Sequence, residues 1–270
     1  MKKNKFNQYF TIILKIAAAV LTVFILIMVF LPKDDIISEH VKDKFVEQPE
    51  VINAVEKSTP TIYQKKQHSN KKMIALTFDD GPKRGVTDRI LDTLEKHNVK
   101  ATFFVIGRQV GANSDLVKRA KDMGCEIGNH TWEHRTLTKL KKEQIRTTLN
   151  RTNFVVRKKA KYDIQMVRPT YGSVDKKVKE SANGPIVFWC VDTKDWNHKK
   201  AKEIQNMIVG KVRDGDIVLM HDIYTETSKA LKKIVPYLKK SGFDIVTVSE
   251  MMNRKGIQMK DGKVYYSGRK

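Results

Sequence analysis

Cysteine is scarce in this sequence. Cys125 and Cys190 are the only two among 270 residues, and each lies within an apolar run. Two isolated cysteines exclude a disulfide-rich scaffold and the closely spaced cysteine sets of zinc fingers. We therefore expect two free, buried thiols, with a bridge between them as the alternative.

Long hydrophobic runs are also absent, with one exception near the N-terminus. Segment 11–31 holds 21 residues, of which one is charged, and a helix of that length spans ~30 Å of hydrocarbon at ~1.5 Å per residue. Three lysines precede the segment, so residues 1–10 should stay in the cytoplasm and the rest of the chain should be exported. A cleaved signal peptide is the alternative, but Val29–Lys33 lacks the small residues of a cleavage site. We predict a retained single-pass transmembrane anchor in the cell membrane, with the folded domain on the extracellular side.

Negative charge is in short supply as well. The chain carries 52 Lys and Arg against 30 Asp and Glu, a net charge of +22. Such a surface attracts polyanions, and DNA is one candidate. No helix-turn-helix pattern is apparent, however, and an exported domain does not normally meet nucleic acid. We expect no nucleic-acid partner and favour anionic wall polymers or lipid head groups, with a DNA-binding membrane protein as the alternative of another class.

Internal repeats and low-complexity tracts are missing too, and the remaining chain divides into three parts. Residues 32–70 mix charged and polar residues with scattered Val and Ile, as in an extracellular stalk. Between residues 71 and 252, short apolar runs alternate with amphipathic segments, which predicts an α/β fold with a mainly parallel sheet. Seven strands fit either a doubly wound sheet or a (β/α) barrel. Residues 253–270 should form a short hairpin or a loose C-terminal tail.

Hydrophobic periodicity defines the individual elements. The expected strands are Met73–Phe78, Ala101–Ile106, Cys125–Gly128, Gln165–Val167, Pro185–Val191, Asp216–Met220 and Phe243–Val248. The expected helices cover about 87–97, 114–123, 141–157, 201–213 and 228–240. Ser114 is expected to cap the second of these helices and Gly124 to follow its C-terminus.

Ionisable and aromatic residues gather directly after five of the expected strands. The five clusters are Thr77–Asp80, Asn129–His134, Arg168–Gly172, Asp192–Trp196 and His221–Asp222. The carboxyl ends of parallel strands form the catalytic face of a β/α barrel. We therefore expect the five clusters to converge on one pocket.

Two of these clusters contain the elements of a metal site. His130 and His134 are four residues apart, which would place both rings on one face of a helical turn. One member of the adjacent pair Asp79 and Asp80 would complete a set of two histidines and one carboxylate, and a bound dication would compensate the charge of both aspartates. By itself each motif has a simpler interpretation, a surface histidine pair and a polar Asp-Gly-Pro turn.

A hydrolytic metal site also needs a base and an acid. Asp79 is the candidate base, and Arg168 would hold it ionised and aimed. His221 is the candidate acid, and the negative charge of Asp195 would keep it protonated. The alternative for His221 is a buried, hydrogen-bonded core residue.

Taken in order, the five motifs resemble those of the polysaccharide deacetylases, carbohydrate esterase family four, which includes the nodulation chitooligosaccharide deacetylase. The motifs are Thr77–Pro82, His130–His134, Arg168–Gly172, Asp192–Trp196 and Ile217–His221. The resemblance covers about residues 71–252 and extends to membrane-anchored peptidoglycan N-acetylglucosamine deacetylases. It implies a deformed (β/α) barrel and metal-dependent removal of acetyl groups from N-acetylglucosamine in polymers.

The resemblance also implies a role for each matching residue. Asp79 matches the catalytic base, Arg168 the arginine that positions it, His221 the acid and Asp195 the partner of the acid. Asp80, His130 and His134 match the metal ligands. Tyr171 matches the residue whose backbone N–H stabilises the oxyanion, and Trp196 and Leu219 resemble the apolar walls around the acetyl methyl group.

These matches predict an amidase that releases acetate from an acetylated glycan. Because an anchor and a stalk would hold the domain over the cell envelope, peptidoglycan is the first substrate to expect. The alternative substrates are poly-N-acetylglucosamine, chitooligosaccharides and an O-acetylated polymer, and the alternative function is an inactive wall-binding barrel. Zinc is the default metal for two histidines and one aspartate, with cobalt, nickel or manganese as alternatives. Thr170 replaces the second proline that the family commonly has there, which affects the expected substrate preference rather than catalysis.

Overall fold

Residues 71–197 and 199–269 are described by a computed structural model of the chain. The predicted anchor at 11–31 and the stalk at 32–70 lie outside these residues. Within the described ranges, no helix is both long enough and apolar enough to cross a bilayer.

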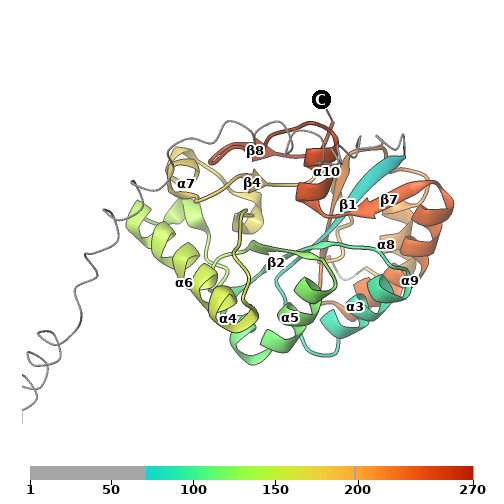
Figure 1. Cartoon of the computed structure of the whole chain (residues 1–270), viewed down its shortest axis with the longest axis horizontal. Helices are drawn as coiled ribbons and strands as arrows, with labels where there is room; N and C mark the ends of the chain where they lie inside the picture. The colour runs from blue at the N-terminus through green and yellow to red at the C-terminus, as the bar shows by residue number, and fades with distance from the viewer. Residues whose placement is uncertain (1–70, 198, 270) are drawn as a thin grey trace, which may run out of the picture. The chain divides into compact units, whose positions relative to one another are not determined.

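The strand β1 (Lys72–Asp79) is central to a sheet of parallel strands (Figure 1). It pairs with β6 (Asp216–His221) along one edge, and with β7 (Phe243–Val246) and then β2 (Thr102–Val105) along the other. β3 (Glu126–Asn129) extends the sheet beyond β2, and β5 (Val191–Asp192) extends it beyond β6. The prediction of an α/β fold built on parallel strands is confirmed.

Shorter pairings link the two sides of this sheet. Val167 bridges from β3 to β4 (Ile186–Val187), and β4 pairs in parallel with β8 (Val264–Tyr265). Just after β8, Ser267 pairs with Asp216 at the start of β6. From β6, the pairings therefore run through β1, β2, β3, Val167, β4 and β8 and return to β6 through Ser267.

Two of the expected strands are shorter in the structure than the apolar runs that predicted them. Gln165–Val167 contributes only the single bridging residue Val167. The run Pro185–Val191 divides into β4 and β5, which pair with β8 and β6 respectively. A hydrophobic run identifies buried chain but does not show where that chain changes its pairing partner.

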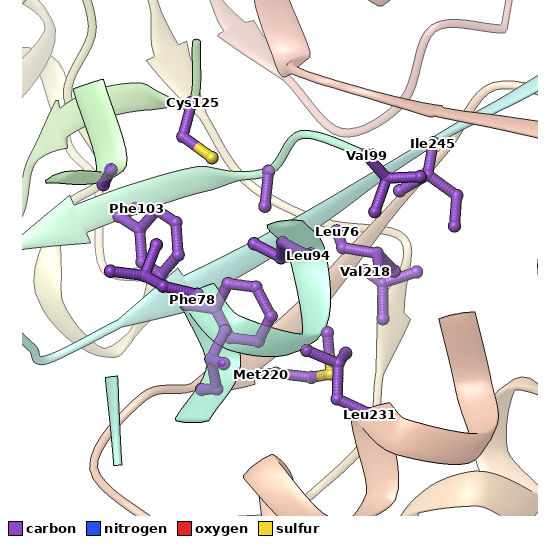
Figure 2. Close-up of a cluster of buried hydrophobic side chains, with 14 of the residues drawn as sticks. Leu76, Phe78, Leu94, Val99, Phe103, Cys125, Val218, Met220, Leu231 and Ile245 are labelled. Carbon is purple, nitrogen blue, oxygen red and sulfur yellow. The ribbon is translucent and has the colours of Figure 1, made fainter. Parts of the chain in front are cut away.

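Alternation along β1 separates the two faces of the sheet. Ile74, Leu76 and Phe78 belong to the larger core, between the strands and the surrounding helices. Figure 2 shows part of this core, where Phe78 stacks on Phe103 with ring centroids 5.1 Å apart. Successive side chains of a strand point to opposite faces, so Ala75, Thr77 and Asp79 share the other face. That face carries a second apolar cluster, which includes Ala75, and then the polar end of the strand.

Helices surround the strands (Figure 1). Among those that contribute to the larger core, five have eight or more residues: α3 (Thr87–Lys96), α5 (Ser114–Asp122), α6 (Lys142–Ala160), α8 (Ala201–Ile208) and α9 (Thr225–Lys240). All five were predicted, within several residues at their ends. Ser114 is not the N-cap of α5, however, because Asn113 takes that position without a side-chain cap, whereas Gly124 does follow the helix with φ of 77°.

Three short helices were not predicted. They are α4 (Gly107–Ala112), α7 (Lys176–Ser181) and α10 (Val248–Arg254). The strand expected at Phe243–Val248 ends early because Thr247 caps α10, accepting a hydrogen bond from the N–H of Glu250. Helices of six or seven residues show too few turns for their periodicity to be detected.

The C-terminal segment and one cysteine differ from expectation. Within the range predicted as a hairpin or a loose tail, the described residues 253–269 form neither, because Val264–Tyr265 pairs with β4 and the Tyr266 ring packs on Phe188. Both cysteines are free, but only Cys125 is buried. Cys190 is exposed because it lies where the chain leaves β4 for β5, outside the alternation of a continuous strand.

Candidate active site

The turn after β1 sends its two aspartates in different directions. Asp79 is the last residue of the strand and is buried, whereas Asp80 has a positive φ of 77°. Aspartate tolerates this left-handed conformation better than most residues. As a result, the Asp79 carboxylate faces Arg168, while the Asp80 carboxylate faces His130 and His134.

Arg168 is fully buried and fixes the position of Asp79. Its Nη1 donates to Asp79 Oδ1 at 2.8 Å and to Thr77 Oγ1 at 2.7 Å. The other side of the guanidinium donates to the carbonyl oxygens of Val187 and Phe188, both at 2.9 Å. Each nitrogen of the buried guanidinium therefore donates a hydrogen bond. The second carboxylate oxygen of Asp79, Oδ2, is not bound by Arg168 and faces the site.

The loop that carries the two histidines is not the helical turn that their spacing predicted. Thr131 and His134 both have positive φ, at 71° and 60°. Side chains hold the loop in this shape, because Asn129 Oδ1 accepts from the Thr131 N–H at 2.8 Å and Thr131 Oγ1 accepts from the His134 N–H at 3.0 Å. The two rings nevertheless lie together, with centroids 5.1 Å apart.

Asp80, His130 and His134 form a group that fits a divalent metal. His130 Nε2 lies 3.5 Å and His134 Nε2 3.2 Å from Asp80 Oδ1, and one ligand atom from each residue lies within 4.8 Å of the others. His130 Nδ1 donates to the Arg168 carbonyl at 2.6 Å, so its Nε2 lone pair points toward the carboxylate.

Two further observations support the fit. Asp80 Oδ1 is buried and has no hydrogen-bond partner, which is costly for a carboxylate oxygen without a bound cation. Burial, followed by the nearby His130, lowers the pKa of His134 below 6.5, which favours the neutral imidazole that a metal requires. The three residues present therefore match an Asp-His-His site.

His221 lies across from Asp79 at the end of β6, where the register pairs the two residues. Its Nδ1 is 2.7 Å from Asp195 Oδ1, and its backbone N–H donates to Asp195 Oδ2 at 2.8 Å. Burial alone lowers the pKa of His221, but the hydrogen bond and charge of Asp195, with Asp79 and Asp80, outweigh it and raise the pKa to about 9. His221 is thus held as a cation whose Nε2 proton is not engaged by Asp195.

This raised pKa predicts how stability depends on pH. Because the folded value of about 9 lies above the ordinary 6.5, protonated His221 stabilises the fold fully below about pH 6.5, and this contribution is lost as pH rises through about 9. We expect the unfolding free energy of the metal-stripped chain to fall by on the order of 3 kcal/mol across that window. Urea unfolding at several pH values measures the fall. An Asp195→Asn variant should show a smaller one, and an equal fall in both chains would contradict the assignment to this pair.

Three residues predicted to contact substrate lie at different depths. The side chains of Tyr171 and Trp196 are exposed, and the Tyr171 ring meets His134 edge-on with centroids 4.6 Å apart. Leu219 is buried, two residues before His221 on the same face of β6. Tyr171 has a φ of 59°, and within the described chain its backbone N–H donates to no acceptor. That N–H is therefore free to bind an oxyanion.

Thr170 has a hydrogen-bond partner of its own. Its Oγ1 donates to the carbonyl oxygen of Arg135 at 2.9 Å, which ties the Tyr171 turn to the end of the histidine loop. We expect Thr170→Val to lower the unfolding free energy by about 1 kcal/mol and Thr170→Ser to lower it less, because only serine keeps the hydroxyl. Urea unfolding of both variants checks this, and equal losses would show that the hydrogen bond contributes nothing.

Several residues around the site were given no individual role from the sequence. Thr77 links Arg168 to β6, since its hydroxyl donates to the Val218 carbonyl at 2.7 Å. Thr227 Oγ1 donates to Asp195 Oδ2 at 2.7 Å, and the Trp189 ring lies 5.5 Å from the Arg168 guanidinium. Alternation with Asp79 was a signal for Thr77, whereas nothing in the local sequence pointed to Thr227 or Trp189.

Comparison with known proteins shows the family to which this chain belongs. Residues 66–184 match the sequence profile of polysaccharide deacetylases. A peptidoglycan-N-acetylglucosamine deacetylase of Bacillus cereus is 38% identical over 189 residues, which are 67% of this chain and 69% of that one. The chain belongs to the polysaccharide deacetylase family. Its members are hydrolases, and the matched residues 66–184 include the motifs Thr77–Pro82, His130–His134 and Arg168–Gly172.

Other members of the polysaccharide deacetylase family match a part of their length only. Peptidoglycan-N-acetylglucosamine deacetylase PgdA of Listeria monocytogenes is 42% identical over 195 residues, covering 72% of this chain and 41% of that one. Peptidoglycan-N-acetylmuramic acid deacetylase PdaC of Bacillus subtilis is 32% identical over 225 residues, covering 81% and 48%. The chain thus spans less than half the length of these two relatives.

Solved structures of family members have the same fold. A T48 deacetylase with substrate superposes with a TM-score of 0.70 at 35% identity, covering 73% of this chain and 98% of that one. A family 4 acetyl xylan esterase from Clostridium thermocellum, in complex with cobalt, superposes with a TM-score of 0.69 at 35% identity and the same coverage. The family therefore includes proteins named as peptidoglycan deacetylases and one named as an acetyl xylan esterase.

Proposed function

We propose that the chain hydrolyses N-acetyl groups of N-acetylglucosamine residues in peptidoglycan, with one divalent metal, zinc by default. One observation carries the proposal: a carboxylate paired with a buried arginine and a histidine paired with a buried aspartate flank a single Asp-His-His group. In the deformed (β/α) barrel that the strand pairings support, Asp79 and His221 end adjacent strands. A binding module has no need of this arrangement.

Asp79 serves as the base through its free oxygen. Arg168 holds Oδ1, which leaves Oδ2 at 3.7 Å from His130 Nε2 and beside the group that would bind the metal. Asp80, His130 and His134 would hold a dication, which when bound polarises water and the acetyl carbonyl. Asp79 Oδ2 takes the proton from the attacking water, and the Tyr171 N–H donates to the oxygen on which negative charge develops.

His221 completes the reaction as the acid. With Nδ1 held by Asp195, its Nε2 proton passes to the amide nitrogen as the carbon–nitrogen bond breaks. Acetate leaves, and a free amine remains on the sugar. Leu219, two residues earlier on the same strand face, and exposed Trp196 suit the methyl group of a small acyl substituent.

Peptidoglycan is favoured as the polymer because of the relatives and the charge. Relatives from three species are named as peptidoglycan deacetylases, two for N-acetylglucosamine and one for N-acetylmuramic acid. Tyr171 and Trp196 expose aromatic surface beside the site, which suits the faces of sugar rings. N-Acetylmuramic acid and an O-acetylated glycan remain the candidates that the experiment must separate from N-acetylglucosamine.

We also propose that segment 11–31 anchors the protein as a single-pass membrane protein, with residues 71–252 outside the cell. Its 21 residues with one charge, and the lysines before it, support this placement. The net charge of +22 supports contact with anionic wall polymers or lipid head groups.

Acetate release tests the proposed activity. The full-length chain, in detergent, is stripped of metal with a chelator and then reloaded with zinc, cobalt, nickel or manganese. We expect no release without metal and recovery on reloading, with peptidoglycan and chitopentaose as substrates. Acetylated xylan tests the ester alternative, and mass spectrometry of digested peptidoglycan shows which sugar has lost its acetyl group.

The outcomes separate the candidates. Loss of acetyl from muramic acid alone would replace the proposed sugar, and release from xylan alone would replace the amide by an ester. Tight zinc binding with no release from any substrate would favour an inactive wall-binding barrel.

A further inference from the structure

Asp222, the residue after His221, is buried beneath the turn that carries both aspartates. It is 1% exposed, and its backbone N–H donates to the Asp79 carbonyl at 3.2 Å. Oδ2 accepts from Thr87 Oγ1 at 2.6 Å, while Oδ1 has no hydrogen-bond partner. No step of the proposed reaction uses this carboxyl group, so its burial calls for another explanation.

Gly81 shows what the Asp222 carboxyl group contacts. A Cβ atom added to Gly81 would lie 2.0 Å from Asp222 Oδ2 and 2.2 Å from Oδ1. Gly81 does not have a positive φ, so its backbone conformation is open to any residue. Glycine is needed here because the carboxyl group of Asp222 fills the space where a side chain would be.

The same carboxyl group is connected to the start of α3. Thr87 Oγ1, which donates to Asp222, accepts from the Lys83 N–H at 2.8 Å. Asp222 therefore joins three parts of the chain: the end of β6 with His221, the turn Asp79–Gly81, and the loop that leads into α3. These parts carry the candidate acid, the candidate base and one candidate metal ligand.

We propose that Asp222 is a positioning residue, which packs its carboxyl group against Gly81 and so fixes the Asp79–Asp80 turn relative to His221. It acts through the turn and does not itself touch the substrate. The proposal rests on the proposed function for the roles of Asp79, Asp80 and His221. Residues that orient metal ligands from behind typically change metal affinity by 10–100-fold when replaced.

Zinc affinity of the full-length chain tests the proposal without reference to substrate. Zinc dissociation constants are measured by competition with a chelating dye. We expect Asp222→Ala to raise the dissociation constant by about 10-fold or more, and Asp222→Asn, which keeps the shape, to change it by less than about threefold. On peptidoglycan, Asp222→Ala should lower kcat and leave KM nearly unchanged.

Glu126→Ala is the matched control. Glu126 is also a buried carboxylate that accepts from a threonine hydroxyl, Thr102 at 3.0 Å, but it lies at the opposite end of its strand from His130. The Glu126→Ala variant should lower the midpoint temperature of thermal unfolding without changing zinc affinity. A loss of stability alone therefore does not produce the expected result.

Gly81 provides a second test that does not depend on how Asp222→Ala folds. Gly81→Ala should raise the zinc dissociation constant because its methyl group would clash with the Asp222 carboxyl group. In the double variant with Asp222→Ala, the fold-increase in the zinc dissociation constant should be smaller than the product of the fold-increases in the two single variants. The clash is then removed.

Three results with the variants would overturn the proposal. They are a folded Asp222→Ala with zinc affinity and kcat within twofold of wild type, a Gly81→Ala with unchanged zinc affinity, and additive effects in the double variant. A wild-type chain that binds no zinc would overturn it together with the metal site. If wild type binds zinc but releases no acetate, the proposed function fails while the zinc measurements still decide the role of Asp222.

Discussion

Replacing Asp79 by asparagine is expected to lower kcat for acetate release by about 10²–10⁴-fold. Asparagine keeps the size of the side chain but cannot take a proton from water. The candidate metal ligands Asp80, His130 and His134 are untouched, so zinc should still bind. Steady-state acetate release on peptidoglycan, with zinc content measured on the same samples, checks both parts of the expectation.

The control for this variant is an aspartate of similar chemistry away from the site. Asp163, exposed and paired with Arg157, can be changed to asparagine and should leave kcat unaltered. If Asp79→Asn with zinc bound kept more than a tenth of the wild-type rate, Asp79 would not be the base, and another group would have to take the proton.

The second large effect is on stability, and it concerns Arg168. Replacing it by methionine should lower the unfolding free energy by about 3–5 kcal/mol, because Asp79 would be left as a buried charge without its partner. Asp79 is 3% exposed and cannot regain this interaction from water. The carbonyl oxygens of Val187 and Phe188 would lose their donors as well. Urea unfolding of the metal-stripped chains measures the loss.

The double variant Asp79→Asn with Arg168→Met separates the ion pair from the other contacts of the arginine. Since neither side chain then carries a charge, the double variant should be less destabilised than the sum of the two single variants. A simple sum would show that Asp79 and Arg168 do not interact, in conflict with their distance of 2.8 Å.

Much of the candidate site followed from one regularity of the sequence. Polar clusters stood at the ends of apolar runs, and parallel strands bring such ends to one edge of a sheet. The structure brings Asp79, Asp80, His130, His134, Arg168, Asp195 and His221 together in that way. Spacing along the chain was enough, because strand direction, rather than loop conformation, decides which residues meet.

Loop conformation was where sequence reasoning failed. His130 and His134 were expected on a helical turn, but the side-chain oxygens of Asn129 and Thr131 accept backbone hydrogen bonds that stabilise a loop with positive φ at Thr131 and His134 instead. A spacing of four residues is compatible with both shapes. Similarly, the run Pro185–Val191 gave no sign of its division between β8 and β6, because both partners are distant in sequence. Propensity and periodicity are local, whereas these choices depend on tertiary contacts.

The pairing of β1 with β6 has a consequence for how the enzyme becomes active. Thr77 and Val218, which are hydrogen-bonded across the two strands, are 141 residues apart in sequence. Pairing over such a separation closes a long loop, and its entropic cost makes the contact slow to form. The candidate acid His221 and the candidate base Asp79 therefore meet only when this late step is complete. During refolding, helical circular dichroism should recover before hydrolysis begins, so a partly folded chain would be catalytically silent.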